Sequence, residues 1–338
     1  MQGVTTVGLD LAKNVFQVHA IDAAGTVLAR RQLRRAEVLK FFSGLPRCLV
    51  GMEACASAHH WARELAALGH EVRLMPPAYV KPYVKRGKTD AADAEAICEA
   101  VTRPTMRFVA VKTADQQAVL MLHKTRDLLV RQRTMLVNAL RGHLAEYGIV
   151  HRQGAVGVAA AIQALHEARD ALPELARDAL HTIVARLRDL SAEVERIEAR
   201  IVAWHRGNET SRRLATIPGI GPITASAIAA AVPDASLFRS GRQFAAWLGL
   251  TPRAHSSGGR ERLGGISKQG DGYLRRLLVV GATAMVRLAR RDAGRQPWMA
   301  RLLERKPAKV AAVALANKMA RVAWAVTMRK EAYAAPAA

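Results

Sequence analysis

The sequence has few cysteines, few acidic residues and no long uninterrupted hydrophobic run. Its three cysteines, Cys48, Cys55 and Cys98, match neither a zinc-binding spacing nor a disulfide framework. We therefore expect them to be reduced core thiols of a cytoplasmic protein. The chain starts directly with a strand-like pattern instead of a signal peptide, which leads to the same expectation.

The longest stretch without a charged side chain covers residues 214–233, and its length alone is compatible with a membrane-spanning helix. Pro218, Gly219, Gly221 and Pro222 interrupt this stretch near its start, and alanine dominates the remainder. Because prolines and neighbouring glycines end or bend a helix, we reject a membrane helix here and predict no membrane partner.

Acidic residues are strongly outnumbered by basic ones. The chain has 51 Lys and Arg residues against 28 Asp and Glu residues, which gives a formal net charge of +23. Solubility does not require such an excess, and the simplest physical reason for it is a polyanionic partner. Such binding would weaken steeply with salt, because phosphate contacts release counterions. The alternative is a genome composition that favours arginine and alanine.

The length of 338 residues allows about two domains of roughly 100–200 residues each. Residues 1–110 predict an α/β domain, because three strand-like segments are followed by alternating helical and strand-like segments. Strands are expected at residues 4–10, 15–21, 26–33, 48–52 and 71–75, and helices at 36–43, 58–69 and 90–101.

Residues 111–208 predict a helical coiled-coil region. A first helix is expected at residues 115–147, whereas residues 150–171 carry no clear pattern. Farther on, apolar residues recur every seven positions, which is typical of a coiled coil. The two series are Leu180, Leu187, Val194 and Ile201, and Ile183, Leu190, Ile197 and Trp204. We favour an antiparallel helical hairpin, whose partner helix is 115–147 or belongs to another protomer of a homo-oligomer.

Residues 209–332 predict a separate, mostly helical basic domain in which acidic residues are sparse. Helices are expected at residues 222–232, 240–248, 271–290 and 308–329. Residues 251–270 are rich in glycine and serine, and we predict a flexible loop that contacts a phosphate backbone. The basic residues of this loop are Arg253, Arg260, Arg262 and Lys268.

The break inside the uncharged stretch resembles the hairpin of a helix-hairpin-helix motif. It reads LATIPGIGPITA at residues 214–225. Gly219 and Gly221 allow the backbone to turn tightly and to approach a phosphate closely. Amides at the start of the next helix can then bind that phosphate. The alternative is an ordinary turn between two helices.

Four acidic residues stand where a metal site can be built. Asp10 and Glu53 each end an apolar strand-like segment. Asp90 and Asp93 lie three residues apart at the start of a helix, so they share one face. Converging carboxylates repel one another unless a cation neutralises them, and Mg²⁺ or Mn²⁺ prefers such oxygen ligands. The alternative is that these acids only suit strand ends and helix starts.

Three segments around these acids resemble the acidic motifs of one family of bacterial transposases. They read VGLDLAK at residues 7–13, GMEA at residues 51–54 and KTDAADA at residues 88–94. The family is the bacterial insertion-sequence family one-ten with its eleven-eleven subgroup, related to the Piv DNA invertases. The resemblance implies a ribonuclease-H-like, RuvC-like amino-terminal domain. It also implies that the metal-binding tetrad is Asp10, Glu53, Asp90 and Asp93.

The resemblance extends to the basic domain, where the segment FAAWLGLTPR stands at residues 244–253. Family members carry a nucleophilic serine just after such a segment, and it maps to Ser257, with the adjacent Ser256 as the alternative. A serine hydroxyl needs a base, a metal or a cationic setting to react. His255 is a candidate base, and the nearby arginines could stabilise the charge on the phosphate.

The resemblance further implies DNA strand exchange through a serine-linked intermediate. The expected partners are donor and target DNA and a non-coding bridge RNA that pairs with both. A homo-oligomer, a dimer or a tetramer, would act on two DNA segments in the bacterial cytoplasm, associated with the nucleoid.

Three other functions fit part of the pattern. A structure-selective nuclease of the resolvase type would use the same carboxylates and a water nucleophile, and Ser257 would be dispensable. A phosphotransferase of the actin or sugar-kinase type would need glycine and Ser or Thr after Asp10, where Leu11 and Ala12 stand. A non-enzymatic nucleic-acid scaffold would bind without metal and would cleave no strand.

Overall fold

The structure is a computed structural model that describes residues 2–85, 87, 89–167, 171–255, 258–260, 262–292, 294 and 297–334. Its internal contacts divide the chain into two compact units. Unit 1 comprises Met1–Gln117 and Ala231–Arg239, and unit 2 comprises Ala118–Ala230 and Ser240–Ala338. The three-domain division made from the sequence stays a prediction.

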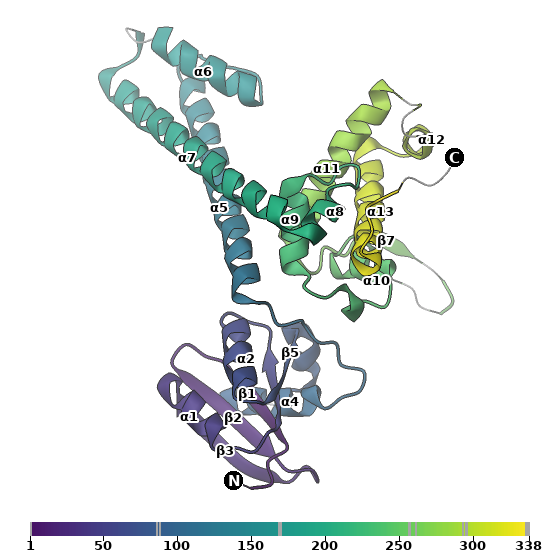
Figure 1. Cartoon of the computed structure of the whole chain (residues 1–338). Coiled ribbons are helices and arrows are strands. Elements are labelled where there is room, and N and C mark those ends of the chain that lie inside the picture. Colours follow the sequence, from purple (N-terminus) through teal and green to yellow (C-terminus); the bar gives the residue numbers. More distant parts are fainter. Residues whose placement is uncertain are drawn as a thin grey trace. The chain divides into compact units, whose positions relative to one another are not determined.

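Unit 1 is built on a five-stranded mixed sheet with the strand order β3-β2-β1-β4-β5 (Figure 1). Strands β1, β2 and β3 pair antiparallel, whereas β1 pairs parallel with β4, and β4 pairs parallel with β5. The strands are β1 (Thr6–Asp10), β2 (Val15–Ile21), β3 (Val27–Arg34), β4 (Leu49–Glu53) and β5 (Glu71–Met75). The predicted strands and the α/β class are thus confirmed.

Helices cover both faces of this sheet. Val7 and Leu9 of β1 are fully buried and share a core with side chains of α1 and α2 on one face. Helix α4 packs on β1, β2 and β4 from the other face. The helices of unit 1 are η1 (Arg35–Glu37), α1 (Val38–Ser43), α2 (Ala58–Ala67), α3 (Pro77–Val80), η2 (Lys81–Tyr83), α4 (Asp90–Val101) and η4 (Ala235–Leu237).

Two glycines allow α4 to lie directly on the sheet. A Cβ atom on Gly8 of β1 would lie 2.1 Å from the carbonyl oxygen of Ala94 and 2.5 Å from the amide nitrogen of Cys98. A Cβ atom on Gly51 of β4 would lie 2.7 Å from Cβ of Val101. Any side chain at these positions would push the helix away, because a packed interior does not absorb an added methyl group without strain.

Two long helices and a shorter one form a helical arm. They are α5 (Ala114–Ala145), α6 (Ala155–Glu167) and α7 (Glu174–Gly207). Arg126 in the first half of α5 pairs with Glu198 in the second half of α7. Leu140 and Leu144 near the end of α5 pack against Leu180 near the start of α7. Helices α5 and α7 are therefore antiparallel, which confirms the predicted hairpin within one chain.

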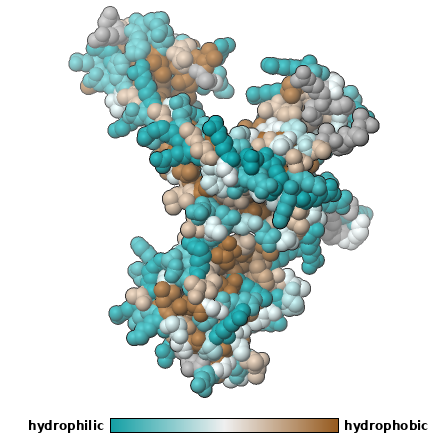
Figure 2. Space-filling view, viewed as in Figure 1, coloured by the Kyte–Doolittle hydropathy of each residue, from teal (hydrophilic) through white to brown (hydrophobic). Residues whose placement is uncertain are grey.

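The heptad pattern of α7 matches its burial. The first predicted series is buried, namely Leu180, Leu187, Val194 and Ile201. The second series is half-buried, namely Ile183, Leu190, Ile197 and Trp204. Hydrophilic residues cover most of the visible surface of the arm, with hydrophobic residues in small patches (Figure 2).

The rest of unit 2 is a group of helices with a small β-hairpin. Its elements are α8 (Glu209–Leu214), α9 (Pro222–Ala231), α10 (Gly241–Trp247), β6 (Pro252–Ala254), β7 (Leu263–Ile266), α11 (Gly272–Arg291), α12 (Pro297–Arg305) and α13 (Ala308–Arg329). Helix α13 is long and apolar enough to cross a membrane. It packs on α8, α10, α11 and α12, so we interpret it as the core helix of this group.

The structure corrects the sequence-based prediction in four segments of unit 2. The expected loop at residues 251–270 contains the antiparallel strands β6 and β7. Residues 150–171 gave no pattern, yet they contain α6. Helices α8 and α12 were not expected. Strand β7 was missed because its sequence, LGGI, contains two glycines, which are poor strand formers.

Candidate metal centre and nucleic-acid-binding elements

Asp10 and Glu53 lie at the same edge of the sheet. Asp10 is the last residue of β1 and Glu53 is the last residue of β4. These strands are parallel neighbours, with Leu9 opposite Met52, so both acids follow the same step of the ladder. Both side chains are half-buried. The sheet topology therefore brings the first two predicted acids together, as expected from the sequence.

Helix α4 supplies the other two acids. Asp90 is its first residue, and Asp93 lies one turn farther on. The hydroxyl group of Thr89 accepts a hydrogen bond of 3.2 Å from the amide of Ala92, so Thr89 caps the helix. The N-cap of α4 is therefore Thr89, and Asp90 is the first residue of the helix.

Three of the four acids converge. Asp10, Asp90 and Asp93 each offer a carboxylate oxygen, and these atoms lie within 4.8 Å of one another. Glu53 does not belong to this group in the structure, although it stands beside Asp10 on the next strand. Like charges so close together are unfavourable without a counter-charge, so this group could hold a divalent cation.

The turn between α8 and α9 has two glycines with different surroundings. Gly219 has a φ of +87°, and a Cβ atom there would lie 2.9 Å from Met285. A Cβ atom on Gly281 of α11 would lie 2.0 Å from the carbonyl oxygen of Gly219. Gly219 is therefore needed for packing. Gly221 faces open space just before α9, so a phosphate could approach the backbone there.

The base of the β6–β7 hairpin is tightly packed. A Cβ atom on Gly270 would lie 1.8 Å from the carbonyl oxygen of Trp247, and one on Gly249 would lie 2.3 Å from that of Gln269. Lys268 adopts a left-handed φ of +56°, and its amide donates a hydrogen bond to the carbonyl oxygen of Gly249. The segment 251–270, which was predicted to be a flexible loop, therefore has a fixed backbone at both of its ends.

The cations predicted for this segment lie on or beside the hairpin. Arg253 of β6 donates a hydrogen bond of 3.1 Å to the carbonyl oxygen of Ser267, so it also fixes the hairpin. The carbonyl oxygen of Arg262 accepts a bond of 2.8 Å from the amide of His255. Arg260 is exposed, as is Lys268. Ser256 and Ser257 lie outside the described residues.

Two family models match the chain. The model of DEDD transposases of the IS110 type, described as "Transposase", matches residues 7–149. The model described as "Transposase IS116/IS110/IS902 family" matches residues 211–299. A "Probable family 20 transposase" of Pseudomonas aeruginosa is 53% identical over 333 residues, which cover 98% of each chain. The chain belongs to the IS110 family of transposases. The predicted family membership is thereby confirmed, and transposases are enzymes that cleave and rejoin DNA.

Further relatives agree with this assignment. The "Transposase for insertion sequence element IS1111A" of Coxiella burnetii is 40% identical to the transposase over 336 residues, covering 98% of this chain and 92% of the relative. The "Pilin gene-inverting protein" of Moraxella bovis is 31% identical over 125 residues, covering 35% of this chain and 37% of the relative. The match to the Moraxella protein covers about a third of each chain, so it shows only a local similarity.

Sequence reasoning missed an ion-pair cluster beside the acids of the transposase. The side chain of Lys85 pairs with Glu95 of α4 at 2.6 Å, and Arg30 of β3 pairs with the same carboxylate at 3.6 Å. The hydrogen bond from Lys85 lowers the pKa of Glu95. These ion pairs join Lys85 and strand β3 to helix α4. No local pattern reveals them, because Arg30 is distant in the sequence.

Cys55 is another group close to the acids. Burial raises the pKa of its thiol, and the negative charges of Glu53 and Asp10 raise it further. Cys48 and Cys98 are buried, and burial raises the pKa of each to about 11. The prediction of core thiols is thus confirmed for Cys48 and Cys98, whereas Cys55 is exposed.

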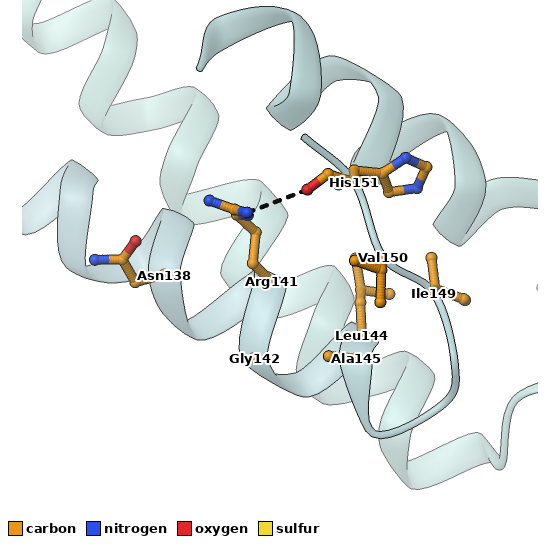
Figure 3. Close-up of a pocket in the computed structure, with 9 residues that line it drawn as sticks. Asn138, Arg141, Gly142, Leu144, Ala145, Ile149, Val150 and His151 are labelled. Carbon is orange, nitrogen blue, oxygen red and sulfur yellow. Dashed lines mark hydrogen bonds between the residues drawn. The ribbon is translucent and has the colours of Figure 1, made fainter. Parts of the chain in front are cut away.

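The cavity at the C-terminal end of α5 is not a candidate for the catalytic site (Figure 3). It has a volume of about 260 Å³. Arg141 crosses it to donate a hydrogen bond of 3.1 Å to the carbonyl oxygen of His151. None of the described residues that line it offers a carboxylate, a hydroxyl or a thiol. These residues are Asn138, Arg141, Gly142, Leu144, Ala145, Ile149, Val150, His151 and Ala161.

Proposed function

We propose that the transposase performs metal-dependent DNA cleavage and strand exchange during transposition, through a covalent bond between a serine and DNA. The observation that carries the metal dependence is the convergence of Asp10, Asp90 and Asp93 within 4.8 Å. Carboxylates at this distance repel one another, and each of the three side chains offers an oxygen ligand, so the group is suited to a cation. We propose Mg²⁺ as the resident ion and Mn²⁺ as a substitute, since both prefer oxygen ligands.

The amino-terminal unit is proposed to be ribonuclease-H-like, in the manner of RuvC. Its mixed sheet supports this, because the acids stand at the ends of the parallel neighbours β1 and β4 and at the start of α4. Asp10, Glu53, Asp90 and Asp93 would hold the metal. When bound, Mg²⁺ would stabilise the negative charge that develops on the scissile phosphate.

Ser257 is proposed as the nucleophile, with Ser256 as the alternative. Its oxygen would bond to phosphorus, the bond from phosphorus to the deoxyribose oxygen would break, and the serine proton would pass to a base. Arg253, Arg260, Arg262 and Lys268 would hold the DNA backbone beside this serine. Of these, Arg253 already donates to Ser267, so it would act from a fixed position.

DNA binding is proposed to involve the α8–α9 turn as well. Gly221 leaves the start of α9 open to a phosphate, and the high net charge of the chain provides non-specific attraction. A non-coding bridge RNA that pairs with donor and target DNA is proposed from the family resemblance. The high positive charge suits RNA as well as DNA. A protein that acts on bacterial DNA would work in the cytoplasm, associated with the nucleoid.

A homo-oligomer, a dimer or a tetramer, is proposed because α5 carries an exposed apolar stripe. Met121, Leu128 and Met135 recur every seven residues along this helix, and their exposed fractions are 67%, 47% and 69%. An apolar stripe of heptad spacing suits a second helix. The three regions 1–110, 111–208 and 209–332 would then serve metal binding, assembly and DNA exchange, respectively.

A covalent trapping assay tests this function. The full chain is mixed with Mg²⁺, a circular-junction donor DNA and RNA transcribed from the flank of the element, then denatured and separated by electrophoresis. We expect a DNA–protein adduct that Ser257→Ala abolishes and Ser256→Ala preserves. Cleaved DNA without an adduct would indicate a nuclease that uses water, the second candidate, because the same carboxylates would suffice for it. Asp10→Ala should abolish cleavage in either case.

A further inference from the structure

A buried histidine joins three helices of unit 2. His123 of α5 has an exposed fraction of 1%. Its Nδ1 atom lies 3.0 Å from the hydroxyl oxygen of Tyr273 in α11. Its Nε2 atom lies 3.1 Å from the hydroxyl oxygen of Ser226 in α9. The three side chains are 103 and 150 residues apart in the sequence, so only the tertiary fold brings them together.

The hydrogens of this network have one consistent arrangement. The hydroxyl group of Ser226 donates to the carbonyl oxygen of Pro222 at 2.7 Å, so its single proton is used. His123 must then donate from Nε2 to Ser226. Its Nδ1 atom consequently accepts a hydrogen bond from the hydroxyl group of Tyr273, which itself accepts one from Arg126. Burial, followed by the charge of Arg126, lowers the pKa of His123 to about 4. The neutral imidazole that this arrangement requires is therefore present at physiological pH.

Both ends of the network lead to elements assigned to DNA. Ser226 lies one turn after Pro222, which follows the open Gly221. Tyr273 is the second residue of α11, and its amide donates to the Asp271 side chain that caps this helix. Asp271 directly follows Gly270, at the base of the β6–β7 hairpin. The network therefore fixes the positions of α9 and of the hairpin base relative to α5.

A second contact reinforces the link between α5 and α11. Arg276, one turn after Tyr273, pairs with Asp127 of α5. Its guanidinium group also lies 5.6 Å from the centre of the Tyr273 ring. Buried polar groups are costly when only part of their hydrogen bonds is formed, so such a network strongly favours one arrangement over nearby alternatives. An apolar side chain at position 123 could pack among these helices, but it would fix the relative positions of α5, α9 and α11 less well.

We propose that His123 is a positioning residue of the transposase: through Tyr273 and Ser226 it holds the α9 turn and the β6–β7 hairpin in the arrangement needed for attack on DNA. The inference rests on the proposed serine chemistry, because it concerns the hairpin that carries the proposed nucleophile. It assigns a role in catalysis to residues that contact neither the proposed metal ligands nor the proposed nucleophilic serine.

The test uses the full chain and separates the two links of the histidine. Tyr273→Phe removes the donor to Nδ1, and Ser226→Ala removes the acceptor of Nε2. We expect each change to slow adduct formation at saturating DNA by about 10-fold or more, because small misplacements of reacting groups are costly. The DNA concentration for half-maximal rate should change by less than about 2-fold, since phosphate contacts remain. Tyr147→Phe and Ser191→Ala are matched controls, because Tyr147 is exposed and Ser191 donates only to its own helix.

Conservative variants of the histidine give a readout that simple destabilisation would not. Gln places an amide donor near the position of Nε2, so His123→Gln should keep the link to Ser226 and lose the one to Tyr273. In that background, Tyr273→Phe should slow the reaction no further, whereas Ser226→Ala should. His143→Gln, an exposed change on the same helix, is the control. All rates are measured at a temperature at which circular dichroism finds every variant folded.

Amide hydrogen exchange keeps this inference separate from the serine chemistry. The amides of Ser267 and Lys268 donate to the carbonyl oxygens of Thr251 and Gly249 at the hairpin base. In Tyr273→Phe they should exchange about 10-fold faster than in the wild type. A wild type without adduct would refute the proposed serine chemistry, while faster exchange would still support positioning. Unchanged exchange in Tyr273→Phe, or adduct formation at the wild-type rate, would overturn the role of His123.

Discussion

Replacing Gly8 by alanine tests how α4 brings its acids to the sheet. The added Cβ atom would lie 2.1 Å from the carbonyl oxygen of Ala94 and 2.5 Å from the amide nitrogen of Cys98. Both are backbone atoms of α4, which cannot rotate away as a side chain can. Ordinary contacts between such atoms begin at about 3.4 Å, so the helix must move by about 1 Å or the sheet must bend.

The substitution should lower both the unfolding free energy of the chain and its affinity for a divalent metal. Overpacking of this kind typically costs about 1–3 kcal/mol of unfolding free energy, and a clash with rigid backbone should lie at the upper end. A shift of about 1 Å also moves Asp90 and Asp93 relative to Asp10, whose ligand atoms now lie within 4.8 Å. We expect divalent metal affinity to fall by about 10-fold or more, since metal sites tolerate little misplacement of their ligands.

Two measurements on the full chain check this prediction. Urea unfolding in the presence of a chelator gives the stability without metal, and electron paramagnetic resonance of added Mn²⁺ gives the metal affinity. The matched control is Gly44→Ala, because a Cβ atom there would meet its nearest neighbour at 3.6 Å, an ordinary contact. We expect the control to stay within about 0.5 kcal/mol of the wild type.

The reasoning would be refuted by a Gly8→Ala protein with wild-type stability and wild-type Mn²⁺ affinity. That result would mean that α4 does not rest on β1 as closely as the structure has it. Loss of stability with unchanged Mn²⁺ affinity would refute the narrower point, namely that this contact positions Asp90 and Asp93.

Three further predictions concern the metal centre, the arm and the thiols. Asp10→Asn should abolish the binding of Mn²⁺, because it removes one of the three converging carboxylates; Mn²⁺ that electron paramagnetic resonance still finds bound to this variant would contradict the prediction. Leu140→Ala should cost about 2–5 kcal/mol in thermal unfolding, because Leu140 is fully buried, whereas Leu175→Ala, an exposed change on α7, should cost about 0.5 kcal/mol or less. Cys55 should react with a thiol reagent at pH 8 while Cys98 stays intact, since a pKa of about 11 leaves Cys98 about one part in a thousand thiolate; faster labelling of Cys98 would disprove the burial argument.

Local patterns predicted most of unit 1 correctly. The apolar runs before Asp10 and Glu53 mark strands that end where expected, because a strand buried on both faces needs apolar residues throughout. Thr89 before Asp90 is a typical capping residue, so the start of α4 could be found to the residue. The heptads of α7 likewise predicted its buried side, since their spacing is a property of one helix.

The same reasoning failed where structure depends on distant contacts. The β6–β7 hairpin was taken for a loop, because its strands are short and owe their order to the base that Gly249 and Gly270 fix. Gly219 was predicted to allow a tight turn near a phosphate, and its role in phosphate binding stays a prediction. The packing of Gly219 was missed, namely the close approach of Gly281 of α11. Neither contact produces a periodic pattern of residues in the sequence.

The sequence by itself determined which residues this transposase has for chemistry and on which elements they lie. Four acids at two strand ends and one helix start follow from local burial and capping. Only the tertiary structure decided which of them converge: Asp10 meets Asp90 and Asp93, whereas Glu53 stays outside the group. Only the tertiary structure, too, joined His123 to Tyr273 across 150 residues. The physical reason is that side-chain direction and helix register are set by packing, which a linear pattern does not encode.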